Sequence, residues 1–284
     1  MSVSVPAPAP AIVGRPPWAM TALGVAYMAA LVLLPLGMVF VEAFRRGPEA
    51  YLAVFRLSDT WSAIRLTLTV AAISVPLNAA FGVAAAWATT KFEFKGKSLL
   101  VTLIDLPFSV SPVISGLVWV LLFGASGWLA GLVEATGVKV LFATTGLVLA
   151  TTFITLPFVA RELIPLMQEQ GSDEESAAIT LGAGGWTTFF RVTLPNIRWA
   201  LVYGVLLSNA RAMGEFGAVS VVSGHIRGKT NTLPLHVEIL YNEYDFVGAF
   251  AAASVLAALA LVTLAIKALL ERRFAGELSA RARH

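Results

Sequence analysis

The chain has 284 residues, of which 57% are hydrophobic and 13% are charged, and its mean hydropathy is +0.79. Soluble domains carry roughly 25% charged residues, so the composition excludes a protein whose whole surface faces water and predicts an all-α polytopic membrane protein. The absence of cysteine excludes a disulfide framework, cysteine-ligated metal centres and thiol catalysis, and the net charge of +3 is too small to indicate nucleic-acid binding.

Residues 1–17 are rich in proline and alanine and predict a disordered cytoplasmic lead-in. We expect a first transmembrane helix with an outside loop over 18–60, a transmembrane core over 61–270 and a basic cytoplasmic tail over 271–284. The first apolar run is too long for the core of a cleaved signal peptide. A membrane-spanning helix needs about 20 apolar residues. Six stretches satisfy this length: Trp18–Phe44, Leu66–Thr90, Ser98–Phe123, Thr144–Met167, Trp199–Ser223 and Phe246–Leu270.

The distribution of lysine and arginine predicts the orientation, because cytoplasmic loops carry an excess of both residues. If the N-terminus is inside, twelve of these residues fall in inside segments and seven in outside segments. Both termini and the polar segment 168–197 are therefore expected on the cytoplasmic side.

Three motifs with a catalytic appearance do not support an enzyme. Ser223–Thr230 ends like a phosphate-binding loop, but the glycine that such a loop requires is one position out of place. Gly124–Gly127 has the form of an intramembrane serine protease motif, yet no histidine lies in a predicted span to act as its base. His225 and His236 are expected to be solvated loop residues, so no catalytic or metal-binding residue is predicted.

Three ionisable side chains are expected within or close to the spans, where charges are costly and usually functional. Arg211 and Glu215 are four residues apart, so they share a helix face and can pair. The pair either lines a polar translocation path or is neutralised and stabilises the helix bundle. Asp105 is the third candidate and is expected close to the cytoplasmic interface.

The polar stretch from Ser172 to Pro195 interrupts this apolar chain. Its acidic start predicts a short helix capped by Ser172 or Asp173. Clustered glycines then predict a turn, followed by a second short helix from Trp186 that Pro195 is expected to end. Exposed aromatic residues on two short helices indicate a docking surface, and an amphipathic loop lying on the membrane is the alternative.

This stretch resembles the cytoplasmic signature of permease subunits of importer-type ABC transporters. That signature is Glu-Ala-Ala, three residues, Gly, nine residues, then Ile-x-Leu-Pro, and here Ala177-Ala178, Gly182 and Val192–Pro195 keep the spacing. Ser176 stands at the glutamate position, with Glu175 directly before it. The stretches 103–112, 209–224 and 232–235 resemble sulfate/thiosulfate permease subunits of the CysW type, and the likeness extends over Trp61–Leu270.

The resemblance implies a type I ABC importer permease fold and a transporter subunit without a catalytic site, in a bacterial inner membrane. It implies three kinds of partner besides lipid: a non-identical permease of the CysT type, two copies of a cytoplasmic ABC ATPase that binds the ATP and magnesium, and an extracytoplasmic sulfate-binding protein. The implied substrate is sulfate, with thiosulfate as a second substrate and molybdate or tungstate as the alternative. An intramembrane enzyme and a passive channel are the competing classes.

The residues expected to couple to the ATPase are Glu175, Ser176, Ala177, Ala178, Leu181, Gly182, Trp186 and Pro195, and the candidates for the path are Arg211, Glu215 and Asp105.

Overall fold

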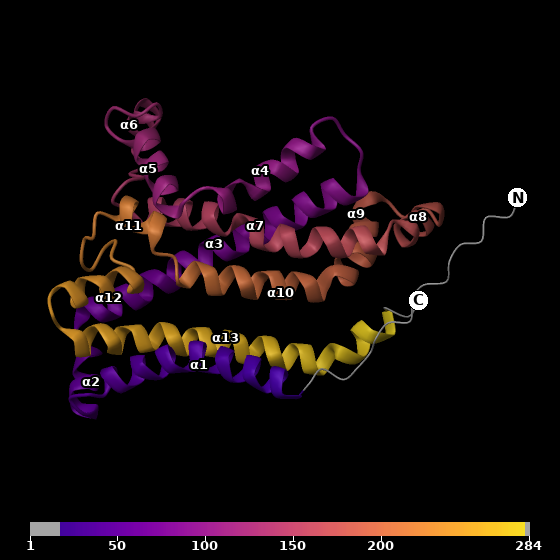
Figure 1. Cartoon of the computed structure of the whole chain (residues 1–284). Helices are drawn as coiled ribbons and strands as arrows, with labels where there is room; N and C mark the ends of the chain where they lie inside the picture. The colour runs from indigo at the N-terminus through magenta and orange to yellow at the C-terminus, as the bar shows by residue number, and fades with distance from the viewer. Residues whose placement is uncertain (1–17, 282–284) are drawn as a thin grey trace, which may run out of the picture.

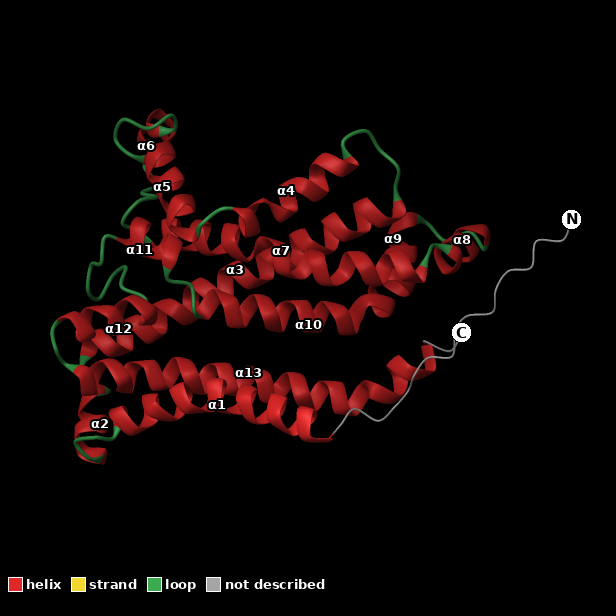
Figure 2. Cartoon of the chain, viewed as in Figure 1, coloured by secondary structure: helices red, strands yellow, loops and turns green. Residues whose placement is uncertain are grey.

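The computed structural model describes residues 18–281, with the backbone alone for residues 271–281, and every regular element in these residues is helical (Figures 1 and 2). The predicted lead-in over 1–17 lies outside the described residues. The elements are α1 (Trp18–Ala43), α2 (Pro48–Val54), α3 (Ser58–Lys91), α4 (Lys97–Ser109), α5 (Pro112–Phe123), α6 (Ala130–Thr136), α7 (Thr144–Gln170), α8 (Asp173–Thr180), α9 (Gly185–Thr188), the π-helical turn η1 (Phe189–Thr193), α10 (Leu194–Met213), α11 (Gly217–Ser223), α12 (Leu233–Asn242) and α13 (Phe246–Arg281).

The prediction of an all-α polytopic membrane protein is confirmed, although the spans differ in detail from those expected. Among the described residues, α1, α3, α7 and α13 are each long and apolar enough to cross a membrane, and α4 with α5 makes a fifth candidate. The stretch Ser98–Phe123 is not one helix, because α4 and α5 are bent by 109° at the break between them. Pro112 begins α5, and the residue before a proline avoids the helical conformation, which explains the break.

The stretch Trp199–Ser223 is also divided, into α10 and α11. The helix ends at Met213, and a new one begins at Gly217 after a short turn. The helix α10 is not among the candidate spans, because it is less apolar than the helices that are. Its polar and charged residues include Asn196, Arg198, Asn209 and Arg211.

The centre of the molecule is the pair α3 and α7, which make the most extensive contact between any two elements. Asn78 of α3 donates a buried hydrogen bond of 2.6 Å (Nδ2 to Oγ1) to Thr155 of α7. One turn further along, Gly82 lies directly against Val159. The helix α10 packs on the same central helix, where Gly204 contacts Val159 and Glu162, and α13 runs beside α1 at the edge of the bundle (Figure 1).

Two groups of short helices and loops lie at opposite ends of the bundle. Figure 1 shows α8, α9 and the connection from α3 to α4 at one end, where α1 begins and α13 finishes. The helices α2, α6 and α12 lie at the other end. This separation matches the inside and outside segments expected from the sequence. Arg161, one of the twelve residues counted in inside segments, lies within α7.

The expectation that His236 is a solvated loop residue is wrong. His236 lies in α12 and is 1% exposed. Its Nε2 lies 3.2 Å from Oγ1 of Thr60 in α3, and its Nδ1 lies 3.4 Å from Nδ2 of Asn231. A helix within the predicted loop therefore buries the ring against α3. His225 is exposed as expected, and its Nε2 lies 3.3 Å from Oε2 of Glu238.

Candidate functional site

The polar stretch forms the two short helices that the sequence predicts. The first turn of α8 contains Asp173, Glu174 and Glu175, and carboxylates are favourable at the positive end of a helix dipole. Ser172 occupies the position before the helix, but its side chain makes no capping hydrogen bond. Gly182 follows with φ of +90°, a conformation that favours glycine, and turns the chain toward α9.

The expectation that Pro195 ends the second helix is wrong. The chain stays helical from α9 through η1 into α10, and Pro195 is the second residue of α10. A proline removes one N–H from the backbone ladder of a helix, and here it closely follows the π-helical turn η1, where the spacing of the backbone hydrogen bonds changes. In η1 the N–H of Leu194 bonds to the carbonyl of Phe189, five residues back. The coupling segment is therefore continuous with α10.

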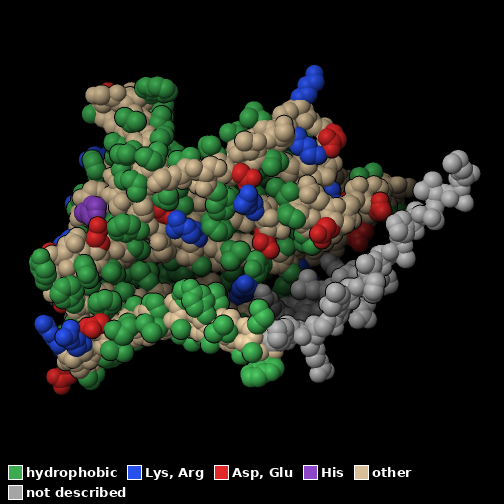
Figure 3. Space-filling model, viewed as in Figure 1, with side chains coloured by type: hydrophobic (Ala, Val, Ile, Leu, Met, Phe, Trp, Pro, Cys, Tyr) green, Lys and Arg blue, Asp and Glu red, His purple; other side chains and the backbone are tan. Residues whose placement is uncertain are grey.

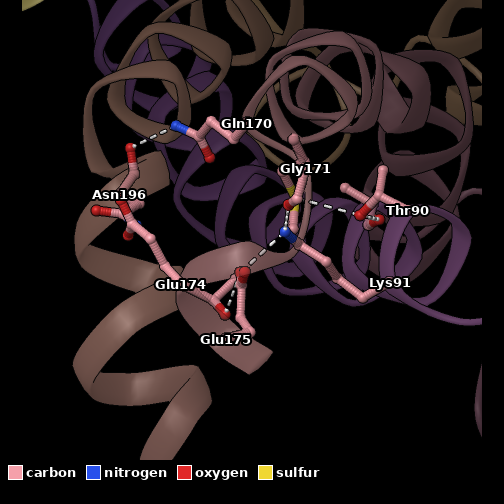
Figure 4. Close-up of polar contacts among 10 residues, drawn as sticks. Thr90, Lys91, Gln170, Gly171, Glu174, Glu175 and Asn196 are labelled. Carbon is pink, nitrogen blue, oxygen red and sulfur yellow. Dashed lines mark hydrogen bonds and ion pairs between the residues drawn. The ribbon is translucent and has the colours of Figure 1, made fainter. Parts of the chain in front are cut away.

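Glu175 turns inward and joins α8 to the end of α3 (Figure 4). Its Oε1 lies 2.9 Å from Nζ of Lys91, and these side chains are 15% and 7% exposed. The same Oε1 accepts a hydrogen bond of 3.1 Å from Oγ1 of Thr193 in η1. All described contacts of this carboxylate are thus within the chain, and the ATPase contact expected of Glu175 remains a prediction.

Further contacts connect the same region to α7 and α10. Nζ of Lys91 also donates to the carbonyl of Gly171, the residue after α7 (Figure 4). Glu174 accepts a hydrogen bond from the side chain of Asn196, and Gln170 Nε2 donates to the Asn196 carbonyl at 3.4 Å. We name Lys91, Gly171, Glu175 and Thr193 the polar clamp. It brings together segments on both sides of α8 and the end of α3.

The opposite side of the segment is apolar and open. Leu181 is 88% exposed and Trp186 is 71% exposed. Ile179 and Phe190 are also exposed, and the Trp186 and Phe190 rings stack with centroids 6.0 Å apart. Of the other predicted coupling residues, Ser176, Ala177, Gly182 and Pro195 are exposed, and Ala178 is half-buried. An apolar surface on a firmly attached helix is suited to binding a partner protein.

The predicted contact between Arg211 and Glu215 is present. Nη1 of Arg211 lies 2.8 Å from Oε2 of Glu215, whose side chain is 1% exposed. Oε1 of Glu215 accepts the backbone N–H of Ala218 at 3.0 Å, so this carboxylate also caps the start of α11. Asp105 pairs with Arg161 of α7, a residue that no sequence pattern marked as a site residue.

Comparison with known proteins decides the family. Residues 78–276 match the protein family described as "Binding-protein-dependent transport system inner membrane component". The chain belongs to this family. It is therefore the permease component of an ABC transporter in an inner membrane, and the prediction of a transporter subunit in place of an enzyme is confirmed.

Several members of this family are similar over most of the chain. The sulfate transport system permease protein CysW of Synechococcus elongatus is 52% identical over 90% of this chain and 90% of its own length. The protein of the same name from Escherichia coli is 50% identical over 90% of this chain and 88% of its own length. The sulfate transport system permease protein CysT of Escherichia coli is 35% identical over 87% of this chain and 90% of its own length.

The fold is that of solved importer permeases. A chain of a bacterial ABC transporter that imports the acidic polysaccharide alginate superposes with a TM-score of 0.73 at 16% identity, covering 90% of this permease and 93% of that chain. At this identity the likeness shows the fold alone. It confirms the ABC importer permease fold that the signature implied.

Proposed function

We propose that this permease is one of two membrane subunits of an ATP-driven importer for sulfate. The observation that carries the coupling role is the exposed apolar surface made by Ile179, Leu181, Trp186 and Phe190, on a segment attached to the bundle by the polar clamp. The substrate is supported by the relatives at 50–52% identity, which are named sulfate transport system permeases. Thiosulfate is the expected second substrate, and molybdate or tungstate is the alternative.

The structure supports a simple route from ATP hydrolysis to the spanning helices. A cytoplasmic ATPase would bind the surface around Leu181 and Trp186, both highly exposed. Movement of that surface would pass through Glu175 and Lys91 to α3, and through η1 directly into α10. Both helices pack on α7, so the centre of the bundle would move as well. Such movement can alternate access only if the two states bind the ATPase differently.

The assembly that we propose follows the known arrangement of the family. This permease would pair with a non-identical permease resembling CysT, and two copies of an ABC ATPase would supply ATP and magnesium. A sulfate-binding protein outside the membrane would deliver the substrate, in agreement with the family description and with the periplasmic protein bound to the alginate transporter. Both termini would lie in the cytoplasm of a bacterium. The coupling end in Figure 1 would then face the ATPase.

A doubly charged oxyanion is costly to desolvate, so the path should offer hydrogen-bond donors. Arg211 is a candidate because its side chain is 35% exposed although it pairs with Glu215. That pairing leaves the site close to neutral. A nearly neutral site favours rapid release, and specificity would then reside in the separate binding protein.

The test is co-purification of the ATPase together with uptake of radiolabelled sulfate. Leu181→Ser should reduce both at least tenfold, because it removes the most exposed apolar side chain of this surface, in the turn directly after α8. Leu132→Ser is the matched control, since Leu132 is 56% exposed on α6 at the other end of the bundle. Excess unlabelled sulfate should abolish uptake, whereas molybdate should compete only weakly. Equal loss in both variants would reject the docking surface, and stronger competition by molybdate would favour the alternative substrate.

A further inference from the structure

An ion pair between α4 and α7 lies on an open face of the permease. Nε of Arg161 donates to Oδ1 of Asp105 at 2.8 Å, and these side chains are 56% and 38% exposed. The guanidinium also lies over the ring of Phe108, with Cζ 4.8 Å from the ring centroid. Phe108 is in turn fixed against Phe158 of α7, with ring centroids 5.2 Å apart. The carboxylate of Asp105 and the ring of Phe108 therefore hold the guanidinium of Arg161 in one orientation.

This pair lies at membrane depth. Asp105 is the ninth residue of α4, so it lies about 12 Å along the helix from its cytoplasmic end. Arg161 lies nine residues before the end of α7, which corresponds to about 14 Å. The hydrocarbon core of a bilayer is about 30 Å thick, so both charges fall within its inner half.

Lipid is an unsuitable neighbour for these charges. An arginine or aspartate at the centre of a spanning helix costs about 2.5–3.5 kcal/mol on insertion scales. In Figure 3, acidic and basic side chains gather in the middle of the visible face, over α4, α7 and α10. This face must consequently meet protein or water.

The guanidinium retains unused hydrogen-bond donors. Within the part of the chain that the structure describes, Arg161 contacts the carboxylate through Nε alone, and its other contact is the Phe108 ring. The two terminal amino groups therefore have no protein partner there. A guanidinium presents donors in a fixed planar arrangement that matches the oxygens of tetrahedral anions.

We propose that Arg161 contacts the translocated oxyanion in the inner half of the path, as a positioned donor to a tetrahedral dianion. Asp105 holds Nε in place and partly neutralises the guanidinium, so the anion binds only weakly and is released toward the cytoplasm. This proposal rests on the proposed function. It adds a contact nearer the cytoplasm than Arg211, which lies about 25 Å along α10 from its cytoplasmic end.

Charge substitutions in the intact transporter separate this role from a structural ion pair. Arg161→Gln should lower sulfate uptake at least tenfold while the amount of assembled complex stays unchanged. Asp105→Asn should lower both the apparent KM and the maximal rate, because the unneutralised guanidinium retains the anion. In the doubly exchanged variant Asp105→Arg with Arg161→Asp, the ion pair can reform, but uptake should stay low. Restored uptake in that variant, or normal uptake in Arg161→Gln, would overturn the proposal.

A second measurement does not depend on the identity of the substrate. The chain has no cysteine, so one introduced cysteine can be labelled without first removing others from it. Thr102 is exposed one turn before Asp105, and Thr102→Cys should react with charged thiol reagents in inverted membrane vesicles. The anionic reagent should react faster relative to the cationic one, and Arg161→Gln should reverse this preference. Leu33→Cys on α1 is the lipid-facing control and should stay unlabelled.

Together, the two measurements distinguish a wrong substrate from a wrong anion site. If the wild-type transporter carries no sulfate but the labelling preference depends on Arg161, the proposed substrate is wrong and the anion site stands. If Thr102→Cys does not react with charged reagents, or if the preference is the same with and without Arg161, the anion site is wrong whatever the substrate.

Discussion

Lys91, the last residue of α3, lies 2.9 Å from Glu175, the third residue of α8 (Nζ to Oε1). Both side chains are largely buried, so solvent and salt screen their interaction little. The contact joins α3, the longest of the candidate spans, to α8, which is next to the surface that we propose for ATPase docking. An acidic residue that the signature suggests as a partner contact is therefore occupied inside the chain.

Lys91→Met should loosen α8 without unfolding the bundle. Removing the ammonium leaves the Glu175 carboxylate with the Thr193 hydroxyl as its described partner, and loss of one partner of a buried polar group costs about 1–3 kcal/mol. We expect faster amide hydrogen exchange over 173–180 and reduced uptake with the ATPase still bound. Lys91→Arg should retain most of both properties.

Lys97→Met provides the control for this substitution. Lys97 pairs with Glu93 at 2.7 Å, but Glu93 is 89% exposed, and exposed pairs contribute only about 0.2–1 kcal/mol. In Lys97→Met, amide hydrogen exchange over 173–180 should proceed at the wild-type rate. If Lys91→Met behaves in the same way as Lys97→Met, the clamp has no role in coupling.

The sequence was sufficient to predict the two short helices α8 and α9, because both the composition and the glycine spacing of this stretch are local features. It could not predict the clamp. Lys91 has the same appearance as any other basic residue at the end of a span, and its partner lies on another helix far along the chain. Arg161 was missed for the same reason, since the pairing with Asp105 depends on how α4 packs against α7.

Two local rules gave the wrong result where a neighbouring element changed the outcome. Pro195 was expected to end a helix, but the chain stays helical through the π-helical turn η1 shortly before it and on into α10. His236 was expected in solvent because it lies in a predicted outside loop, but α12 forms there and buries the ring against Thr60. In both cases the correct result requires the helix boundaries, which are the least certain part of a sequence-based prediction.

Gly82→Ala should destabilise the central pair of helices. An added Cβ would lie 2.7 Å from Cβ of Val159, closer than real contacts allow, so α3 and α7 would have to separate. Overpacking of this kind costs typically about 1–3 kcal/mol. Thermal unfolding of the purified permease should show a lower midpoint. Gly24→Ala in α1 meets no atom within 4 Å, and it should leave the midpoint unchanged or slightly raised.

Glu215 has two functions that substitution can separate. Glu215→Gln retains an oxygen for the Ala218 N–H but removes the charge that neutralises Arg211. We expect an assembled complex with altered sulfate affinity. Glu215→Ala also removes the cap of α11, a loss of about 1 kcal/mol, and should reduce the amount of complex. Arg211→Ala should impair uptake with the complex assembled. If it transports normally, Arg211 belongs to a structural pair and does not line the path.

Changing Gly182 and Trp186 together should separate ATP hydrolysis from transport. Alanine at Gly182 is strained at φ of +90°, and Trp186→Ala removes an exposed ring from the docking surface. The ATPase should continue to hydrolyse ATP while sulfate uptake falls at least tenfold. Trp128→Ala is the control, because Trp128 is 91% exposed in the loop before α6, at the other end. Normal uptake in the double variant would remove these residues from the coupling mechanism.

His236 should make the outer end of the permease less stable at acidic pH. Burial, with a smaller effect from Arg227, lowers the pKa of His236, and Asp59 and Glu243 only partly oppose the shift. The unfolded chain takes up a proton near the ordinary pKa of about 6.5, whereas the folded ring stays neutral to lower pH. Stability is therefore complete above that value and is lost as the pH falls below it, until the ring is protonated in both states. Unfolding measured between pH 7.5 and 5 should show this loss, His236→Gln should remove it, and the exposed His225→Gln should retain it. An equal slope in the His236 variant and the wild type would show that other groups control the acid sensitivity.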